Sequence, residues 1–239
     1  MLDEWGKSAN IRRRQIESGA DLTFSKVFVP YYVRLVAALR PSSLLEVGCG
    51  TGHLSAALSP SVRRVVAVEP SLNMYTVAKN VLYKSNVQVL CSTAEDYTDG
   101  TCFDLIISHM CVQTIEEVAS FLDAVRRHME PTSLFVFSIP HPCFYNSYKH
   151  FFADGEYQYM RVTQKMITFT ITREPETAIS DVPYHHRPIS RYCAYLQEQE
   201  LCVAQFDEIF PEPNVQELYG QPWIEPRYCV FHCRRRGRY

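Results

Sequence analysis

Three alternating glycines that directly follow a short apolar run constrain the fold of this chain more than any other feature. The run covers residues 44–47, and the glycines are Gly48, Gly50 and Gly52. Glycine adopts the backbone conformations that a tight turn requires, and it lets a ligand approach the main chain closely. Dinucleotide-binding loops have the spacing GxGxxG and P-loops continue as GK[ST], so the spacing GxGxG matches neither. The segment therefore predicts a strand, a tight ligand-binding turn and a helix.

Short apolar runs alternate with helix-like segments on both sides of this turn. Continuous β-branched runs are typical of parallel strands that helices cover on both faces. We therefore expect an α/β protein with a doubly wound, mostly parallel sheet of seven strands and a ligand crevice at the strands' carboxyl ends. The expected strands are residues 44–47, 65–68, 87–90, 103–108, 134–139, 201–210 and 228–233, and the expected helices are residues 24–39 with a break or start near Pro30, a segment before Pro60, a segment that Ser71 caps, and residues 116–129 and 189–200.

Residues 141–185 interrupt this alternation. Side chains alternate with a period of two over residues 157–163 and again over residues 167–171, which predicts an antiparallel pair of strands. Such a pair, inserted after the fifth strand, would form a lid over the crevice. We therefore divide the chain into residues 1–140 with the N-terminal helices and the ligand-binding α/β core, residues 141–185 as the lid or substrate insertion, and residues 186–239, which complete the same sheet.

Charge and cysteine content exclude several classes of protein. The net charge of −2 argues against a general nucleic-acid coat or a membrane-surface protein, because both depend on an excess of basic residues. The nine cysteines are irregularly spaced and include no CxxC pair, so we expect neither a disulfide framework nor a metal site. Neither a signal peptide nor an apolar run of membrane-spanning length is evident. We therefore expect a cytoplasmic protein without a membrane partner.

Two carboxylates accompany the glycine turn. Glu46 lies two residues before the first glycine, and Glu69 ends the next expected strand, 23 residues further along the chain. In doubly wound folds, an acid at the end of this strand accepts hydrogen bonds from both hydroxyls of a ribose, and it disfavours a 2′-phosphate. These acids therefore predict an adenosine-type ligand.

Four segments together resemble the class I S-adenosylmethionine-dependent methyltransferases. They are residues 44–52, 65–69, 92–96 and 103–108, and they occur in the order that this family shows. The resemblance implies a Rossmann-like methyltransferase fold with S-adenosylmethionine as cofactor and S-adenosylhomocysteine as product.

The resemblance also assigns roles to residues of these segments. It implies that Glu46 reaches the ammonium group of the cofactor, that the backbone from Gly48 to Gly52 lies against its methionine part, and that Glu69 holds the ribose hydroxyls. The remaining cofactor-binding residues that it implies are Cys49, Gly50, Pro70, Met74, Ala94, Glu95, Ser108 and His109.

Histidines near the expected crevice are candidates for a general base. Residues 184–190 resemble a stretch of small-molecule methyltransferases, but two histidines stand where we expect one. Histidine is the usual base near neutral pH, and a base is needed only for a hydroxyl or a protonated amine. We take His186 as the first candidate, then His185 and His109. For the acceptor we expect contacts from Tyr184 and Phe152, and Trp5 could close over the cofactor.

These observations predict an enzyme that methylates a small molecule, such as a natural product or metabolite, on oxygen or nitrogen. The many aromatic residues of the lid suit a planar or apolar acceptor, although they would also serve to anchor the lid. One alternative is an RNA or protein methyltransferase that uses the arginines of residues 12–14 and 234–238. Another is a non-catalytic protein that binds the cofactor and assembles a partner. The acceptor atom and the oligomeric state are left open.

Overall fold

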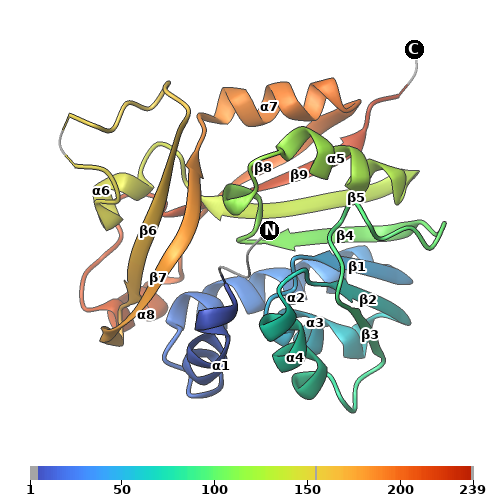
Figure 1. Cartoon of the computed structure of the whole chain (residues 1–239), viewed down its shortest axis with the longest axis horizontal. Coiled ribbons are helices and arrows are strands. Elements are labelled where there is room, and N and C mark those ends of the chain that lie inside the picture. The colour runs from blue at the N-terminus through green and yellow to red at the C-terminus, as the bar shows by residue number, and fades with distance from the viewer. Residues whose placement is uncertain (1–4, 154, 238–239) are drawn as a thin grey trace.

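A seven-stranded sheet forms the centre of the computed structural model, which describes residues 5–153 and 155–237 (Figure 1). The strand order is β3-β2-β1-β4-β5-β9-β8. Neighbouring strands from β3 to β5 run parallel, whereas β9 runs antiparallel to β5 and β8. The expected α/β class and doubly wound sheet are therefore confirmed. The strands are β1 (Ser43–Val47), β2 (Arg64–Val68), β3 (Val87–Leu90), β4 (Phe103–His109), β5 (Met129–Pro140), β8 (Leu201–Ile209) and β9 (Tyr228–Arg235).

Helices cover both faces of this sheet, because successive side chains of each strand point to opposite sides. On β1, for example, Leu44 packs on the side of α2 and α3, whereas Leu45 packs on the side of α5 and α7. The helices are α1 (Ala9–Glu17), α2 (Val29–Leu39), α3 (His53–Leu58), α4 (Leu72–Val81), α5 (Val118–Arg127), α6 (Tyr145–Lys149), α7 (Ile189–Glu198) and α8 (Pro213–Gln216), with shorter turns η1 (Gly6–Ser8), η2 (Thr23–Phe28), η3 (Ser59–Ser61), η4 (Val112–Thr114) and η5 (Glu217–Tyr219).

Ser71 begins a helix where the sequence predicts one. It caps α4, because its Oγ accepts a hydrogen bond from the backbone N of Met74 at 3.2 Å. The expected break or helix start near Pro30 is wrong, because residues 22–39 are helical without interruption. The helix changes there from the π-helical turn η2 to α2, with Pro30 in the first turn of α2.

The parallel register brings the carboxyl ends of three strands together. Glu46 of β1 is paired with Ala67 of β2 and with Ile107 of β4. The backbone N of Gly48 donates to the carbonyl oxygen of Val68 at 2.9 Å, which ties the glycine turn to the end of β2. The segments that follow β1, β2 and β4 therefore lie side by side at one edge of the sheet.

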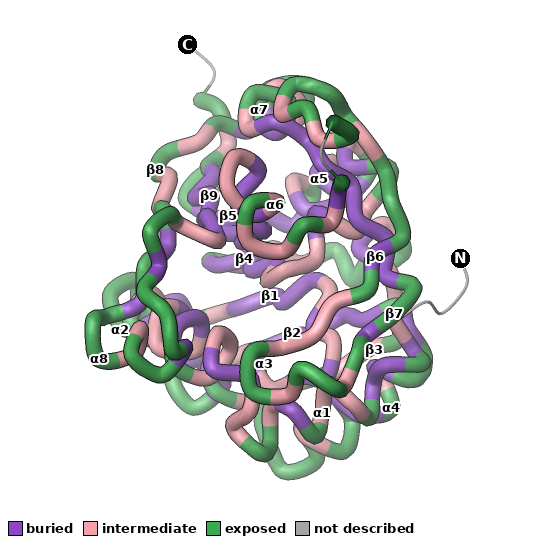
Figure 2. The backbone as a smooth tube through the Cα atoms, turned by 90° about the vertical axis from the view of Figure 1, so that its left-hand side faces the viewer, coloured by how far each residue is buried: buried purple, intermediate pink, exposed green. Residues whose placement is uncertain are grey.

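A second, two-stranded antiparallel sheet stands across this edge (Figures 1 and 2). It consists of β6 (Thr163–Ile171) and β7 (Glu174–His186), which we call the lid sheet. The expected lid hairpin is thus present, but the expected strand at residues 157–163 is wrong, since β6 pairs with β7. The rings of Tyr157 and Tyr159 instead pack against His186, with centroid distances of 5.0 and 6.2 Å, so their alternation reflects packing.

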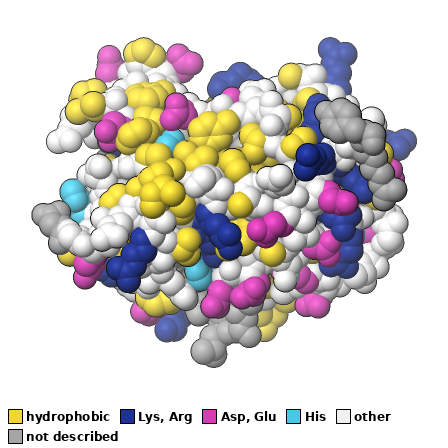
Figure 3. Space-filling model, turned by 90° about the horizontal axis from the view of Figure 1, so that it is seen from above, with side chains coloured by type: hydrophobic (Ala, Val, Ile, Leu, Met, Phe, Trp, Pro, Cys, Tyr) yellow, Lys and Arg dark blue, Asp and Glu magenta, His cyan; other side chains and the backbone are white. Residues whose placement is uncertain are grey.

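Charged side chains of both signs are interspersed on the face seen from above in Figure 3, and hydrophobic side chains gather over its left and middle parts. In the part of the chain that the structure describes, no helix combines the length and the apolar character that crossing a membrane requires.

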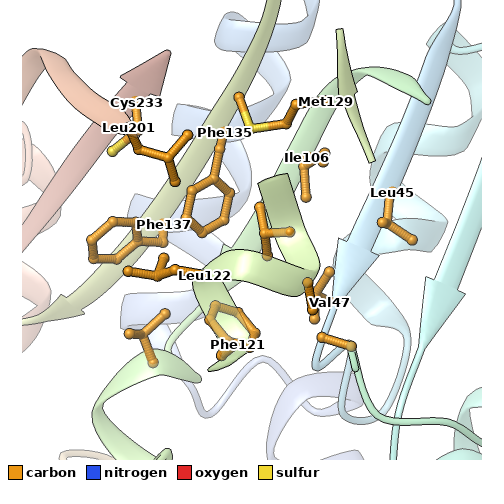
Figure 4. Close-up of a cluster of buried hydrophobic side chains, with 14 of the residues drawn as sticks. Leu45, Val47, Ile106, Phe121, Leu122, Met129, Phe135, Phe137, Leu201 and Cys233 are labelled. Carbon is orange, nitrogen blue, oxygen red and sulfur yellow. The ribbon is translucent and has the colours of Figure 1, made fainter. Parts of the chain in front are cut away.

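Aromatic and aliphatic side chains fill the space between the sheet and the α5–α7 layer (Figure 4). Phe121 and Leu122 of α5 meet Phe135 and Phe137 of β5 there. Phe137 also stacks on Phe231 of β9, with a centroid distance of 4.7 Å and an interplanar angle of 3°. This close packing holds the strands, and hence their carboxyl ends, in fixed positions.

Candidate functional site

A cavity of about 760 Å³ opens at the carboxyl ends of β1, β2 and β4, where the sequence predicts a ligand crevice. Its walls come from the ends of these strands, from η2 and α6, and from both strands of the lid sheet. Ligand pockets typically measure about 300–1,000 Å³, so this cavity is large enough for a ligand of nucleoside size and a further small molecule.

Most of the site residues that the sequence predicts line this cavity. They come from segments that are far apart in the sequence, so the fold brings them together. The lining residues among them are Trp5, Glu46, Gly48, Cys49, Gly50, Glu69, Pro70, Met74, Ala94, Glu95, His109, Tyr184 and His185.

Four predicted site residues lie outside the cavity wall: Gly52, Ser108, Phe152 and His186. A Cβ at Gly52 would lie 3.2 Å from Cα of Ala78, so this glycine allows α3 and α4 to pack closely. Ser108 is completely buried within β4, one residue before the lining residue His109. Phe152 belongs to the small hydrophobic core of the lid.

The two adjacent lid histidines have different surroundings. His185 lines the cavity, whereas Nε2 of His186 donates to the carbonyl oxygen of Tyr159 at 2.8 Å. The first candidate for the base, His186, does not line the cavity, and its ring packs against Tyr157. Burial, followed by the nearby charge of Arg187, lowers the pKa of His185. The imidazole of His185 is therefore neutral at pH 7 and able to accept a proton.

His109 occupies an apolar position at the end of β4. Its Nδ1 lies 2.7 Å from Oγ of Ser138, and its ring packs against Phe28 with a centroid distance of 4.5 Å. Burial lowers the pKa of His109 to about 3. Such an imidazole stays uncharged at neutral pH but holds a proton weakly, so the structure favours a role for His109 in shaping the cavity over a role as base.

The glycine turn combines a packing requirement with an open face. Gly48 has φ +73°, and a Cβ there would lie 2.5 Å from Sγ of Cys111. Gly50 has φ +54°, but a Cβ there would meet no atom within 4 Å. Gly50 lines the cavity, so its backbone is accessible to a ligand.

Glu69 is held in position by the turn itself. Its Oε2 accepts a hydrogen bond from the backbone N of Gly50 at 2.8 Å, and its Oε1 accepts one from the backbone N of Ser71 at 2.9 Å. These two amides orient the carboxylate in the cavity wall. An ionised carboxylate there suits the hydroxyls of a ribose, because charge-assisted hydrogen bonds are strong and directional.

Glu46 is almost completely buried at the base of the cavity, with 2% of its surface exposed. Its Oε2 accepts a hydrogen bond from Oγ of Ser55 on α3. Burial raises the pKa of Glu46 to about 8, and the charge of Glu69 adds to this effect. A cation in the cavity would restore the ionised form, so the position suits an ammonium group.

Stability should therefore depend on pH through Glu46. Between pH 4.5 and about 8 the folded protein keeps a proton on Glu46 that the unfolded chain releases, so the free energy of unfolding should fall as pH rises. Each unit of pKa shift corresponds to about 1.4 kcal/mol, so the loss should reach several kcal/mol. Glu46→Gln should remove this loss in urea unfolding at pH 5 and 8, and Glu198→Gln, at an exposed position, should retain it. Equal pH slopes for Glu46→Gln and wild type would contradict the assignment.

Several lining residues were not singled out from the sequence as site residues. Asp21 and Phe28 precede α2, and Tyr228 begins β9, so the cavity joins segments from opposite ends of the chain. No sequence signal links positions that far apart. Tyr145 and Phe151 belong to the aromatic-rich stretch of the lid, which the sequence indicates as suited to a planar or apolar acceptor without distinguishing these two rings from their aromatic neighbours. Within residues 5–153 and 155–237, no group of three or more His, Cys, Asp or Glu side chains is placed to hold a metal ion.

Comparisons with known proteins agree with this architecture. The family model described as "Methyltransferase domain" matches residues 45–137. A malonyl-[acyl-carrier protein] O-methyltransferase of Methylovorus sp. is 30% identical over 42% of this chain and 37% of its own length. A ubiquinone biosynthesis O-methyltransferase of Bradyrhizobium diazoefficiens is 30% identical over 44% of this chain and 43% of its own length. The match thus spans about two fifths of the length of these curated relatives.

A solved structure extends the likeness of fold to nearly the whole chain. The S-adenosylmethionine-dependent methyltransferase from Clostridium acetobutylicum superimposes with a TM-score of 0.68 at 18% identity, covering 98% of this chain and 99% of that one. The methyltransferase domain, the strand order and the glycine turn with its two acids confirm the resemblance found in the sequence. Residues 45–137 thus match a methyltransferase domain, and the chain as a whole has the fold of this S-adenosylmethionine-dependent methyltransferase.

Proposed function

We propose that this protein is an enzyme that binds S-adenosylmethionine and transfers its methyl group to a small-molecule acceptor. The observation that carries the proposal is that the glycine turn, Glu69, a set of aromatic side chains and both strands of the lid sheet line one cavity. The names of the two curated relatives, both O-methyltransferases, support transfer to oxygen, and nitrogen remains the second possibility.

The cavity residues suit this cofactor. The open backbone at Gly50 would lie against the methionine part, Glu46 would bind its ammonium group, and Glu69 would accept hydrogen bonds from the ribose hydroxyls. When bound, S-adenosylmethionine supplies an activated methyl group on a sulfonium. The protein therefore has two tasks, which are to hold the acceptor atom in line and to exclude water. The lid sheet, which walls the cavity, serves the second task.

The arginines near the N-terminus do not form a free basic surface. Arg12 is paired with Asp21 at 2.7 Å, Arg13 with Glu17 at 2.8 Å, and Arg14 with Glu174 at 3.0 Å. Binding of nucleic acid depends on basic side chains that neutralise phosphates. The paired carboxylates lower the net positive charge that residues 12–14 would offer to RNA, which supports a small molecule as the acceptor. The cytoplasmic location stays a prediction.

Transfer of a labelled methyl group tests the proposed function. Wild-type protein with radiolabelled S-adenosylmethionine and a cell extract divided by size should place label in the fraction of small molecules. The rate should change little between 50 and 200 mM salt, whereas an RNA acceptor should make it fall steeply. Label confined to RNA or protein would contradict the choice of acceptor. Cofactor binding without any transfer would favour the non-catalytic alternative.

His185 is the proposed base for an acceptor that must lose a proton. His185→Ala should lower kcat by about 100-fold or more, the usual range for a positioned base, with unchanged affinity for S-adenosylhomocysteine. Because the lowered pKa of His185 keeps its imidazole neutral, wild-type kcat should persist below pH 6.5 and fall only as this group becomes protonated. His186→Ala is the matched control, since His186 does not line the cavity and its loss should spare kcat. Equal effects of the two substitutions would rule out this assignment.

A further inference from the structure

Six aromatic rings that line the cavity are linked by ring contacts, and we call this set the aromatic arc. It begins beside His109, whose ring lies 5.9 Å from Phe24 and 4.5 Å from Phe28. All of the rings line the cavity. The aromatic arc consists of Phe24, Phe28, Tyr145, Phe151, Tyr184 and Tyr228.

His109 joins Phe24 to Phe28, and from Phe28 onward each ring of the arc contacts the next. Phe28 lies 5.2 Å from Tyr228, and Tyr228 lies 5.4 Å from Tyr145. Tyr145 lies 5.6 Å from Phe151, which in turn lies 5.3 Å from Tyr184 of the lid sheet. Five segments thus contribute to the arc: η2, α6, the segment that follows α6 with Phe151, β7 and β9. Such rings prefer offset or edge contacts with another aromatic ring, so the arc favours a flat aromatic ligand.

The arc adjoins the glycine turn. His109 ends β4, whose neighbour β1 leads into Gly48, and Cys111 packs directly on Gly48. A molecule held against the arc near His109 would therefore lie beside the part of the cavity proposed for the methionine and its sulfur. This placement is what an acceptor subsite requires.

A carboxylate is fixed beside the first ring of the arc. Asp21 lines the cavity, and its Oδ1 accepts a hydrogen bond from the backbone N of Phe24 at 2.9 Å. Its Oδ2 accepts one from Arg12 at 2.7 Å, and the side chain of Asp21 is only 9% exposed. A carboxylate has about four acceptor positions, so Asp21 can still accept a hydrogen bond from a ligand.

The charges around the arc decide which ligand fits. Arg12 balances the charge of Asp21, so the pair does not demand a cation. Lys149 also lines the cavity, but its Nζ donates to the carbonyl oxygen of Thr170 at 2.8 Å, and Arg12 also donates to Gln15 at 2.8 Å. The bond to Thr170 leaves the charge of Lys149 in place, but an anionic group beside Asp21 would lie against a carboxylate, so this end of the arc suits an uncharged donor. The arrangement favours an uncharged ligand that donates a hydrogen bond.

We propose that the aromatic arc is the acceptor subsite and that it takes a flat, uncharged aromatic molecule whose O–H or N–H group donates to Asp21. This inference rests on the proposed methyl transfer and narrows its acceptor to one chemical class. It distinguishes this chain from a methyltransferase whose acceptor is a carboxylate on a flexible acyl chain.

Binding of 2-naphthol and of naphthalene, in the presence of saturating S-adenosylhomocysteine, tests the subsite in the full-length protein. Wild type should bind 2-naphthol more tightly than naphthalene, as followed by probe fluorescence. Asp21→Asn should lower the affinity for 2-naphthol by about tenfold, as expected for loss of a hydrogen bond to a charged group. The affinity for naphthalene should not change. Equal losses for the two probes, or none for either, would overturn the role of Asp21.

Phe24→Leu and Phe151→Leu test the rings independently of Asp21. Each substitution should lower the affinity for both probes by about three- to tenfold, which corresponds to the loss of one aromatic contact. Phe210→Leu is the matched control, because Phe210 is 46% exposed and does not line this cavity, and it should bind like wild type. If Phe24→Leu and Phe151→Leu both bind S-adenosylhomocysteine normally and also keep the wild-type affinity for 2-naphthol, this inference is overturned, but the proposed function is not. Failure of wild type to bind S-adenosylhomocysteine would overturn the proposed function and this inference with it.

Discussion

Gly50→Arg should abolish binding of S-adenosylmethionine and leave the protein folded. The Cβ position of Gly50 meets no atom within 4 Å and faces the cavity, so an arginine there would occupy the space proposed for the methionine part. The positive φ of +54° adds a backbone strain of about 1–2 kcal/mol for any side chain, which a folded domain tolerates. Calorimetric titration with S-adenosylhomocysteine should show no heat of binding, while thermal unfolding should remain cooperative.

Gly100→Arg is the control that separates strain from obstruction. Gly100 has a similar φ of +72° and equally open surroundings, but it does not line the cavity. This variant should lose a comparable amount of stability and keep the affinity of wild type. If Gly50→Arg and Gly100→Arg bind equally well, the glycine turn is not the cofactor site.

Glu69→Ala should weaken the binding of S-adenosylhomocysteine by about 1.5–3 kcal/mol, the usual contribution of hydrogen bonds to a charged group. The substitution also removes the bonds that Glu69 accepts from Gly50 and Ser71, so a loss of affinity alone would not prove contact with the ribose. A second ligand resolves this ambiguity. Wild type should bind 2′-deoxy-S-adenosylhomocysteine more weakly than the parent compound, and Glu69→Ala should bind the two with nearly equal affinity.

Two other results would contradict contact between Glu69 and the ribose. If Glu69→Ala still prefers S-adenosylhomocysteine over its 2′-deoxy analogue as wild type does, another residue holds the ribose hydroxyls. If wild type does not discriminate, the hydroxyls are not recognised in this cavity at all.

Elements whose signals are local could be predicted from the sequence. The run before Gly48 gave β1, Ser71 gave the start of α4, and the β-branched residues 65–68 gave β2, because capping, turn chemistry and strand propensity act over a few residues. The lid was harder. The period of two over residues 157–163 arises because Tyr157 and Tyr159 pack against His186, and a sequence pattern does not distinguish packing from strand pairing.

The cofactor half of the site could be predicted better than the acceptor half, for a physical reason. Glu46, Gly50 and Glu69 lie in or directly after parallel strands, and parallel neighbours bring such positions together. The choice between His185 and His186 depends on tertiary contacts, because His186 is held by the carbonyl oxygen of Tyr159 whereas His185 lines the cavity. The aromatic arc requires contacts such as Phe28 with Tyr228, which join opposite ends of the chain and follow only from tertiary packing.

A crystal structure with bound S-adenosylhomocysteine is the most direct measurement of how this cavity is used. We predict that the ribose hydroxyls lie on Glu69, that the amino group points to Glu46, and that the sulfur faces the aromatic arc beneath the lid sheet. S-adenosylhomocysteine bound outside this cavity, or bound with its sulfur turned away from the arc, would contradict the account.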